Sequence, residues 1–153
     1  MITQPIQNAE VFQTIVTRGL SVFEIAHLPS TQSDAEFWLG KIPDILKLAP
    51  KPTGSADAPL RRGQYLSAVG IVYGKILQLI FGWSLCEVRE DHSQPEDGAV
   101  AVVSPDLSYV VYPIALARKE AHRQEDECRR VYEKIKTGNL QDVPPGSLFE
   151  ITL

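Results

Sequence analysis

The sequence has 153 residues, 44% of them hydrophobic and 22% charged, with a formal net charge of −4. This length suits one domain, which we expect to span residues 1–153, and the apolar content excludes a disordered chain. The negative balance also argues against a nucleic-acid-binding protein, because phosphate recognition requires clustered Lys and Arg.

Two helices are predicted in the N-terminal part of the chain. Asn8 can cap a helix whose apolar residues recur every three or four positions between Val11 and Phe23. The sequence SDAE has the form of a capping box, in which a serine hydroxyl and a glutamate carboxylate satisfy each other's backbone amides. A second helix should therefore begin at Ser33. Pro43 lies inside this helix and is expected to kink it or split it in two.

A proline-rich loop is predicted before the most apolar segment. Residues Ala49–Gly63 include three prolines together with Gly, Ser and Asp, a composition typical of an exposed loop. The following segment, Tyr65–Trp83, is apolar over a length that could cross a bilayer. Lys75 and Gln78 lie near its centre, and a central charge costs roughly 2.5–3.5 kcal/mol in a membrane. We therefore expect a buried core helix that ends at Gly82, and no membrane span.

Three short strands are predicted after the central helix. WSLCEVRE and AVAVVS flank a polar loop with the turn signal Asp97-Gly98, so they should form a hairpin. PDLS then turns the chain into a third strand, YVVYPI. Three sequential strands of this kind predict a small antiparallel meander.

A long C-terminal helix is predicted from Pro113 to about Lys136, since proline is favoured at the first helical position. Gly138 is the expected stop. The tail 139–153 either adds a fourth strand at the edge of the sheet or stays mobile. The elements together predict an α+β fold with N-terminal helices, a small antiparallel three-stranded sheet and a long C-terminal helix. The apolar stripe of that helix comprises Ile114, Ala117, Ala121, Cys128, Val131, Tyr132 and Ile135.

The cysteines and the N-terminal sequence indicate a cytoplasmic protein. Cys86 and Cys128 belong to no C-x-x-C pair or Cys/His cluster, so their spacing provides no metal site. We expect both to be small buried residues, and whether they are free stays open. The N-terminal sequence lacks the basic stretch, apolar run and cleavage site of a signal peptide.

The densest group of charged residues lies in the loop between the first two predicted strands. Carboxylates and an imidazole in one loop could bind a hard cation or act as acid and base. The spacing lacks the ligand ladder of a calcium loop, and a solvated hairpin loop is the plainer interpretation. If the loop has a function, we expect an acidic edge that attracts a basic partner protein. The candidate residues are Glu90, Asp91, His92, Glu96 and Asp97.

Other polar and aromatic groups are weaker candidates. His122 with Glu125 and Asp126 has the spacing of half a metal site, without a matching half elsewhere. Arg61-Arg62, with Lys51 upstream, could bind an anion or be a solvated helix flank. No P-loop, Rossmann or nucleophile-elbow motif occurs, so no catalytic residue and no cofactor are assigned. Aromatic residues of the predicted sheet could anchor a partner where they face outward: Trp83, Tyr109 and Tyr112.

The stretches GQYLSAVGIVYGKILQLIFGWSLCEV and VVSPDLSYVVYPIALARK resemble small bacterial domains of unknown function, some of them immunity-protein-like. In those domains a helix with a Gly-x-Tyr-Leu start leads into a Trp-headed strand, further strands and a Pro-started helix that carries a Lys. The resemblance covers Gly63–Lys119. It implies the fold and an immunity or inhibitor role, and it assigns no functional residue.

We therefore expect a non-catalytic cytoplasmic module that binds another protein. A small-molecule enzyme is the alternative, and it should show a pocket with at least two convergent polar groups of displaced pKa. A structural or oligomerisation module is a third hypothesis, and under it the protein would form a homo-oligomer.

Overall fold

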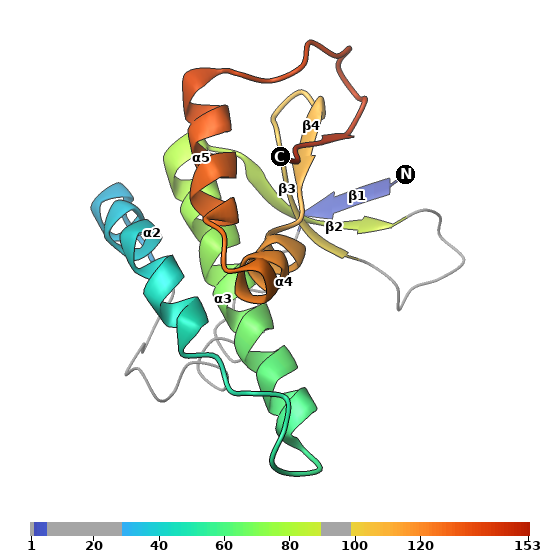
Figure 1. The fold of residues 1–153 in the computed structure, drawn as a ribbon. Helices are drawn as coiled ribbons and strands as arrows, with labels where there is room; N and C mark the ends of the chain where they lie inside the picture. The colour runs from blue at the N-terminus through green and yellow to red at the C-terminus, as the bar shows by residue number, and fades with distance from the viewer. Residues whose placement is uncertain (1, 6–28, 90–98) are drawn as a thin grey trace.

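The structure, a computed structural model, describes residues 2–5, 29–89 and 99–153 (Figure 1). Its helices gather beside a small sheet, and the predicted α+β class is confirmed. The helix predicted between Asn8 and Phe23 lies outside the described residues. The elements, in chain order, are β1 (Ile2–Pro5), α2 (Gln32–Lys47), α3 (Ala58–Phe81), β2 (Ser84–Arg89), β3 (Ala99–Val103), β4 (Tyr109–Val111), α4 (Pro113–Arg123), α5 (Glu127–Thr137) and β5 (Phe149–Glu150).

Helix α2 is capped by Thr31, so the predicted start at Ser33 is wrong. Thr31 is extended, and its hydroxyl accepts a hydrogen bond of 3.1 Å from the amide of Asp34. Threonine caps a helix in the same way as serine, and here it does so earlier in the chain. Pro43 lies inside α2 and does not split it. The buried face of α2 consists of Ala35, Leu39, Ile42, Ile45 and Leu46.

Helix α3 begins at Ala58, so the predicted loop Ala49–Gly63 extends too far. Pro59 stands in the first turn, where a proline lacks only a donor that the helix would not use. The residue that indicated a loop therefore belongs to a helix start. At the other end, Gly82 adopts a φ of 69° and donates its N–H to the carbonyl of Gln78, which confirms it as the stop.

Helix α3 lies at the centre of the fold, between the other helices and the sheet (Figure 1). Within the described part of the chain it is the one helix long and apolar enough to cross a membrane, and 61% of its most apolar window is buried. Lys75 is half-buried and its Nζ donates to Oε1 of Gln78 at 2.8 Å. The central charge of the apolar segment thus finds a polar partner on its own helix.

The strands form one sheet in the order β1-β2-β3-β4-β5. The antiparallel pairing of β2 with β3 and of β3 with β4 confirms the predicted meander. In the tail, β5 pairs in parallel with β4, so the alternative of an additional C-terminal strand is the one observed. β1 pairs with β2 and was not predicted, because a four-residue segment containing proline has no strand pattern of its own.

The predicted long C-terminal helix is two helices, α4 and α5, and that prediction is wrong. Gln124 takes the left-handed conformation at φ 55°, and its N–H donates to the carbonyl of Glu120. The carboxylate of Glu120 then accepts from the amide of Cys128 in the first turn of α5. This side-chain bond provides α5 with a cap from the preceding helix. The predicted start at Pro113 and stop at Gly138 are confirmed.

Two apolar clusters lie on the two faces of the sheet. The larger one fills the space between the sheet and the helices and includes Tyr73, Ile76 and Val102. The smaller one comprises Cys86, Val88, Ala101, Val103 and Val110. Cys86 and Cys128 are both buried and free, which confirms the expectation of small buried residues.

Candidate functional site

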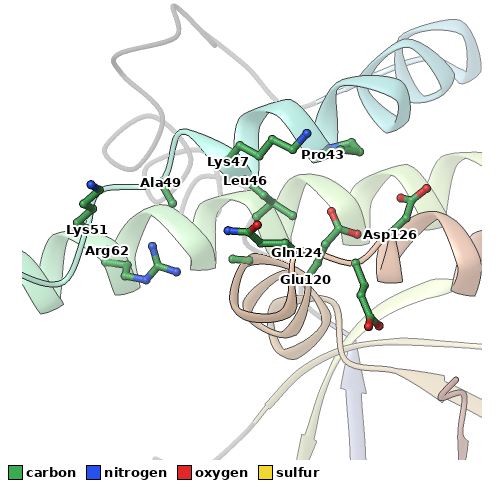
Figure 2. A pocket seen from close by; sticks show the side chains of 11 residues that line it. Pro43, Leu46, Lys47, Ala49, Lys51, Arg62, Glu120, Gln124 and Asp126 are labelled. Atoms are coloured by element: carbon green, nitrogen blue, oxygen red, sulfur yellow. The ribbon is translucent and has the colours of Figure 1, made fainter.

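A pocket of about 630 Å³ opens between α2, the start of α3 and the turn that joins α4 to α5 (Figure 2). This volume is within the range of small-ligand sites in proteins, about 300–1,000 Å³. Its apolar lining includes Pro43, Leu46 and Ala121. Its charged lining comprises Lys47, Lys51, Arg62, Glu120, Glu125 and Asp126.

The wall formed by α2 and α3 is held together by two side-chain to backbone hydrogen bonds. The hydroxyl of Tyr65 donates to the carbonyl of Ile45 at 2.6 Å, which joins the end of α2 to α3. Nη1 of Arg62 donates to the carbonyl of Pro50 at 3.1 Å, which joins α3 to the connection between the helices. This bond places Arg62 at the pocket wall. It uses one N–H of the guanidinium group, which has five N–H donors in total.

Glu120 lies at the opposite wall, at the end of α4, and is 4% exposed. Its Oε1 accepts from the amide of Cys128 at 2.9 Å, whereas its Oε2, which is closed off from solvent, has no hydrogen-bond partner among the described residues. Burial raises the pKa of Glu120, and the neighbouring carboxylates of Asp126 and Glu127 raise it further, against a lowering by the backbone amides of Cys128 and Glu127. The carboxyl therefore lies in a site that disfavours its charge.

A second buried carboxylate, Glu127, differs from Glu120 in having cations beside it. Its Oε2 lies 3.5 Å from Nζ of Lys119, and its Oε1 lies 3.9 Å from Nη1 of Arg123. No ion pair of this kind involves Glu120 within residues 29–89 and 99–153. Glu120 is thus a buried carboxylate without a cation of its own among the described residues.

The floor behind Glu120 is a buried polar layer between α3 and α5. The hydroxyl of Tyr73 donates to the carbonyl of Cys128 at 2.7 Å, and the amide of the same residue donates to Glu120. Burial raises the pKa of the Tyr73 hydroxyl and of the Cys128 thiol well above their usual ranges, so both stay neutral. The layer fixes the position of the Glu120 carboxylate through packed, satisfied neighbours.

The lining that the structure describes is charged and polar on several sides. It holds carboxylates, lysine amines, a guanidinium and the amide of Gln124. Such groups can bind a charged ligand, and amines and carboxylates can also act as nucleophiles or as acid and base. Within the described ranges, no group of three or more His, Cys, Asp or Glu residues is arranged to hold a metal ion. The pocket can pair a cation with Glu120 and an anion with Arg62.

The acidic loop predicted from the sequence is not among the segments that the structure describes. Glu90, Asp91, His92, Glu96 and Asp97 all fall in the segment 90–98, outside the described residues. The acidic partner-binding edge therefore stays a prediction.

The weaker candidates separate into residues that line the pocket and residues that do not. Glu125 and Asp126 line it, whereas His122 is exposed in the last turn of α4. Lys51 and Arg62 line it as well. Arg61 instead pairs with Asp57 at 3.5 Å on the outer side of α3.

The aromatic residues of the sheet do not form an outward-facing anchor together. Trp83 is buried and stacks on Tyr109, with ring centroids 6.4 Å apart and planes 9° from parallel. Tyr109 and Tyr112 are half-buried, and the Tyr109 hydroxyl donates to the carbonyl of Gln141. These rings stabilise the sheet and its connection to the tail.

Sequence reasoning missed Glu120, the central residue of the pocket. A signal was present, because Glu120 follows Leu116 by four positions and Ala117 by three, which places a carboxylate on the apolar stripe. A charged residue at a core position is rare unless it is paired or functional.

Comparison with protein-family models, with curated proteins and with solved structures finds no match for this chain. The geometry of the pocket is therefore the basis of the functional proposal.

Proposed function

We propose that this chain is a non-catalytic cytoplasmic module that binds another protein and receives a positively charged side chain of that protein at Glu120. The observation that carries the proposal is a buried carboxylate, in the wall of a pocket, with one oxygen that finds no hydrogen-bond partner in the part of the chain that the structure describes. An uncompensated buried charge is costly, and an incoming cation would remove much of that cost.

Exposed apolar residues close in sequence to the lining favour a protein as the ligand. Leu48 is 62% exposed and directly precedes a lining residue, Ala49. Leu60 is 65% exposed and lies in the first turns of α3, on a different side of the helix from Arg62. A partner protein that covers Leu48 would gain hydrophobic burial in addition to the polar contacts in the pocket.

The experiment is affinity capture from native cells with three forms of the immobilised protein. The forms are wild type, Glu120→Gln, and the control Glu36→Gln, which removes an exposed carboxylate from α2. We expect a protein retained by wild type and by the control but lost with Glu120→Gln, and the same pattern with the purified partner. Retention of no specific protein, or equal retention by all three forms, would contradict the proposal.

An inhibitor or immunity role is the narrower form of this proposal, implied by the resemblance of Gly63–Lys119. It predicts that the captured partner has an activity of its own, which the wild-type protein suppresses when the two are mixed. If the activity of the captured partner is unchanged, the inhibitor role is contradicted, whereas the proposal of protein binding is not.

A small-molecule enzyme is the second candidate, and the raised pKa of Glu120 favours it. A carboxyl that keeps its proton closer to neutral pH can act as a general acid or base on a bound ligand. The amines of Lys47 and Lys51 in the same lining would be the other groups available for such chemistry. Turnover of a captured small molecule, abolished in Glu120→Gln, would establish this alternative.

A further inference from the structure

Two pairs of charged lining residues lie at opposite ends of the pocket. Figure 2 shows Lys51 and Arg62 at one end and Glu120 and Asp126 at the other. Lys51 and Arg62 come from the connection after α2 and the start of α3, and the acidic residues from the α4–α5 turn and its flanks. A third basic residue of the lining, Lys47, is the last residue of α2 and lies apart from Lys51 and Arg62. A ligand that fills the length of the pocket therefore meets opposite charges at its two ends.

The acidic end is suited to a guanidinium group. Glu120 is held by the Cys128 amide through Oε1, and its Oε2 accepts no hydrogen bond from residues 29–89 and 99–153. Asp126 is near enough to raise the pKa of Glu120. Two carboxylates at one end can share the five donors that a guanidinium presents in one plane. An ammonium group carries three donors at a single point and would match this pair less well.

The basic end is suited to a carboxylate. Arg62 uses Nη1 for the carbonyl of Pro50, which holds the guanidinium in place and leaves its other donors for a ligand. Lys51 is exposed at the rim and adds a second positive charge. An anion here would be bound by a fixed guanidinium fork and attracted by the lysine.

We propose that the pocket recognises a short peptide segment that carries an arginine together with a nearby carboxylate side chain, the arginine on Glu120 and Asp126 and the carboxylate on Lys51 and Arg62. This rests on the proposed function, since it names the part of a partner protein that enters the pocket. Charge complementarity at both ends gives the segment a direction, because reversing it would place like charges together.

The test uses synthetic peptides and binding followed by nuclear magnetic resonance. The probe is acetyl-Arg-Ala-Glu-amide, and it is compared with peptides in which citrulline replaces arginine, lysine replaces arginine, or glutamine replaces glutamate. Citrulline keeps the shape of arginine and lacks its charge. We expect each neutral replacement to weaken binding about tenfold or more, the order of one charge-assisted pair.

Variants assign each end of the peptide to its end of the pocket. Glu120→Gln and Asp126→Asn should remove the preference for arginine over citrulline. Lys51→Gln and Arg62→Gln should remove the preference for glutamate over glutamine and keep the preference for arginine. Glu36→Gln and Lys136→Gln, which alter exposed residues outside the lining, should change neither preference.

Three results would overturn the inference. They are equal binding of the arginine and citrulline peptides, equal binding of the arginine and lysine peptides, and no binding of the probe at millimolar concentration to protein that gives a folded spectrum. Each is distinct from failure of the proposed function, which is measured by capture of a whole partner protein. A variant that unfolds is identified by its spectrum. The other variant at the same end of the pocket then shows whether that end determines the preference.

Discussion

Gly70 lies where α3 passes close to the first turn of α4. A Cβ atom added at Gly70 would overlap the backbone Cα of Ile114 and come within 2.9 Å of its backbone nitrogen. Backbone atoms cannot move aside without shifting the helix, so the substitution forces the two helices apart.

We predict that Gly70→Ala lowers the free energy of unfolding by about 1–3 kcal/mol, the usual result of overpacking a core. The matched control is Gly63→Ala in the same helix, where an added Cβ meets nothing within 4 Å. The control should raise stability by up to about 1 kcal/mol through helix propensity. Urea unfolding of the two variants measures both effects, and equal stability would contradict the close packing of α3 on α4.

Glu120 makes stability depend on pH. Its pKa in the folded protein is raised above the ordinary value of 4.5, chiefly by burial. The folded state therefore binds more protons than the unfolded state between these two values. The contribution of Glu120 to stability is complete below the unfolded pKa and is lost as pH rises through the folded pKa.

We predict that the free energy of unfolding of the wild type falls relative to that of Glu120→Gln as pH rises from about 4.5 towards neutrality. The variant keeps an oxygen for the Cys128 amide and removes the titrating group. Chemical unfolding of both proteins across this range measures the difference. A stability difference that stays constant with pH would show that burial does not raise the pKa of the Glu120 carboxyl.

Residues with fixed backbone requirements were predicted well, and residues with tertiary roles were not. Pro113, Gly82 and Gly138 each act at the helix end that the sequence indicated, because proline and glycine impose local geometry. Glu120 carries no local signal of that kind. Its burial depends on helices that the sequence does not place beside it.

At the scale of elements, the start of α2 provides a direct test of which hydroxyl caps the helix. Thr31→Ala removes the acceptor for the Asp34 amide and should lower stability by about 1 kcal/mol. Ser33→Ala should change stability by less than about 0.5 kcal/mol, because Ser33 lies inside the helix on its exposed side. Thermal unfolding distinguishes the two variants, and a larger loss at Ser33 would restore the cap expected from the sequence.

The break between α4 and α5 shows what helical periodicity cannot reveal. The apolar stripe continues through the break, and neither glycine nor proline occurs there. Gln124 nevertheless adopts a left-handed conformation, which is unfavourable for a residue with a Cβ, and the apolar residues of the next helix, such as Cys128 and Val131, are buried. The pattern therefore predicted the buried residues of this region correctly and the continuity of the helix wrongly.

At the scale of the whole molecule, the fold follows from where α3 lies. Its length and hydropathy alone would permit a membrane span, but it is surrounded by α2, α4 and the sheet. We predict that the protein stays in the aqueous fraction when cells are broken without detergent. Recovery only in detergent would contradict the burial of α3 by its own chain.

The pocket could not have been predicted from the sequence, because its two walls are distant in the chain. Residues of the α2–α3 region and of the α4–α5 turn meet through the packing of α4 on α3 and on α2. The individual residues Lys51, Arg62, Glu125 and Asp126 were noticed as charged groups. Their assembly around Glu120 is a property of the folded chain.

The most direct measurement of the central claim is the pKa of the Glu120 carboxyl, followed by nuclear magnetic resonance with and without acetyl-Arg-Ala-Glu-amide. The free protein should show a pKa above the ordinary value of 4.5, and the peptide should lower it, since a bound cation favours the charged form. The citrulline peptide should leave it unchanged. A Glu120 pKa that does not respond to the arginine peptide would contradict the assignment of this carboxylate as the receptor of a cation.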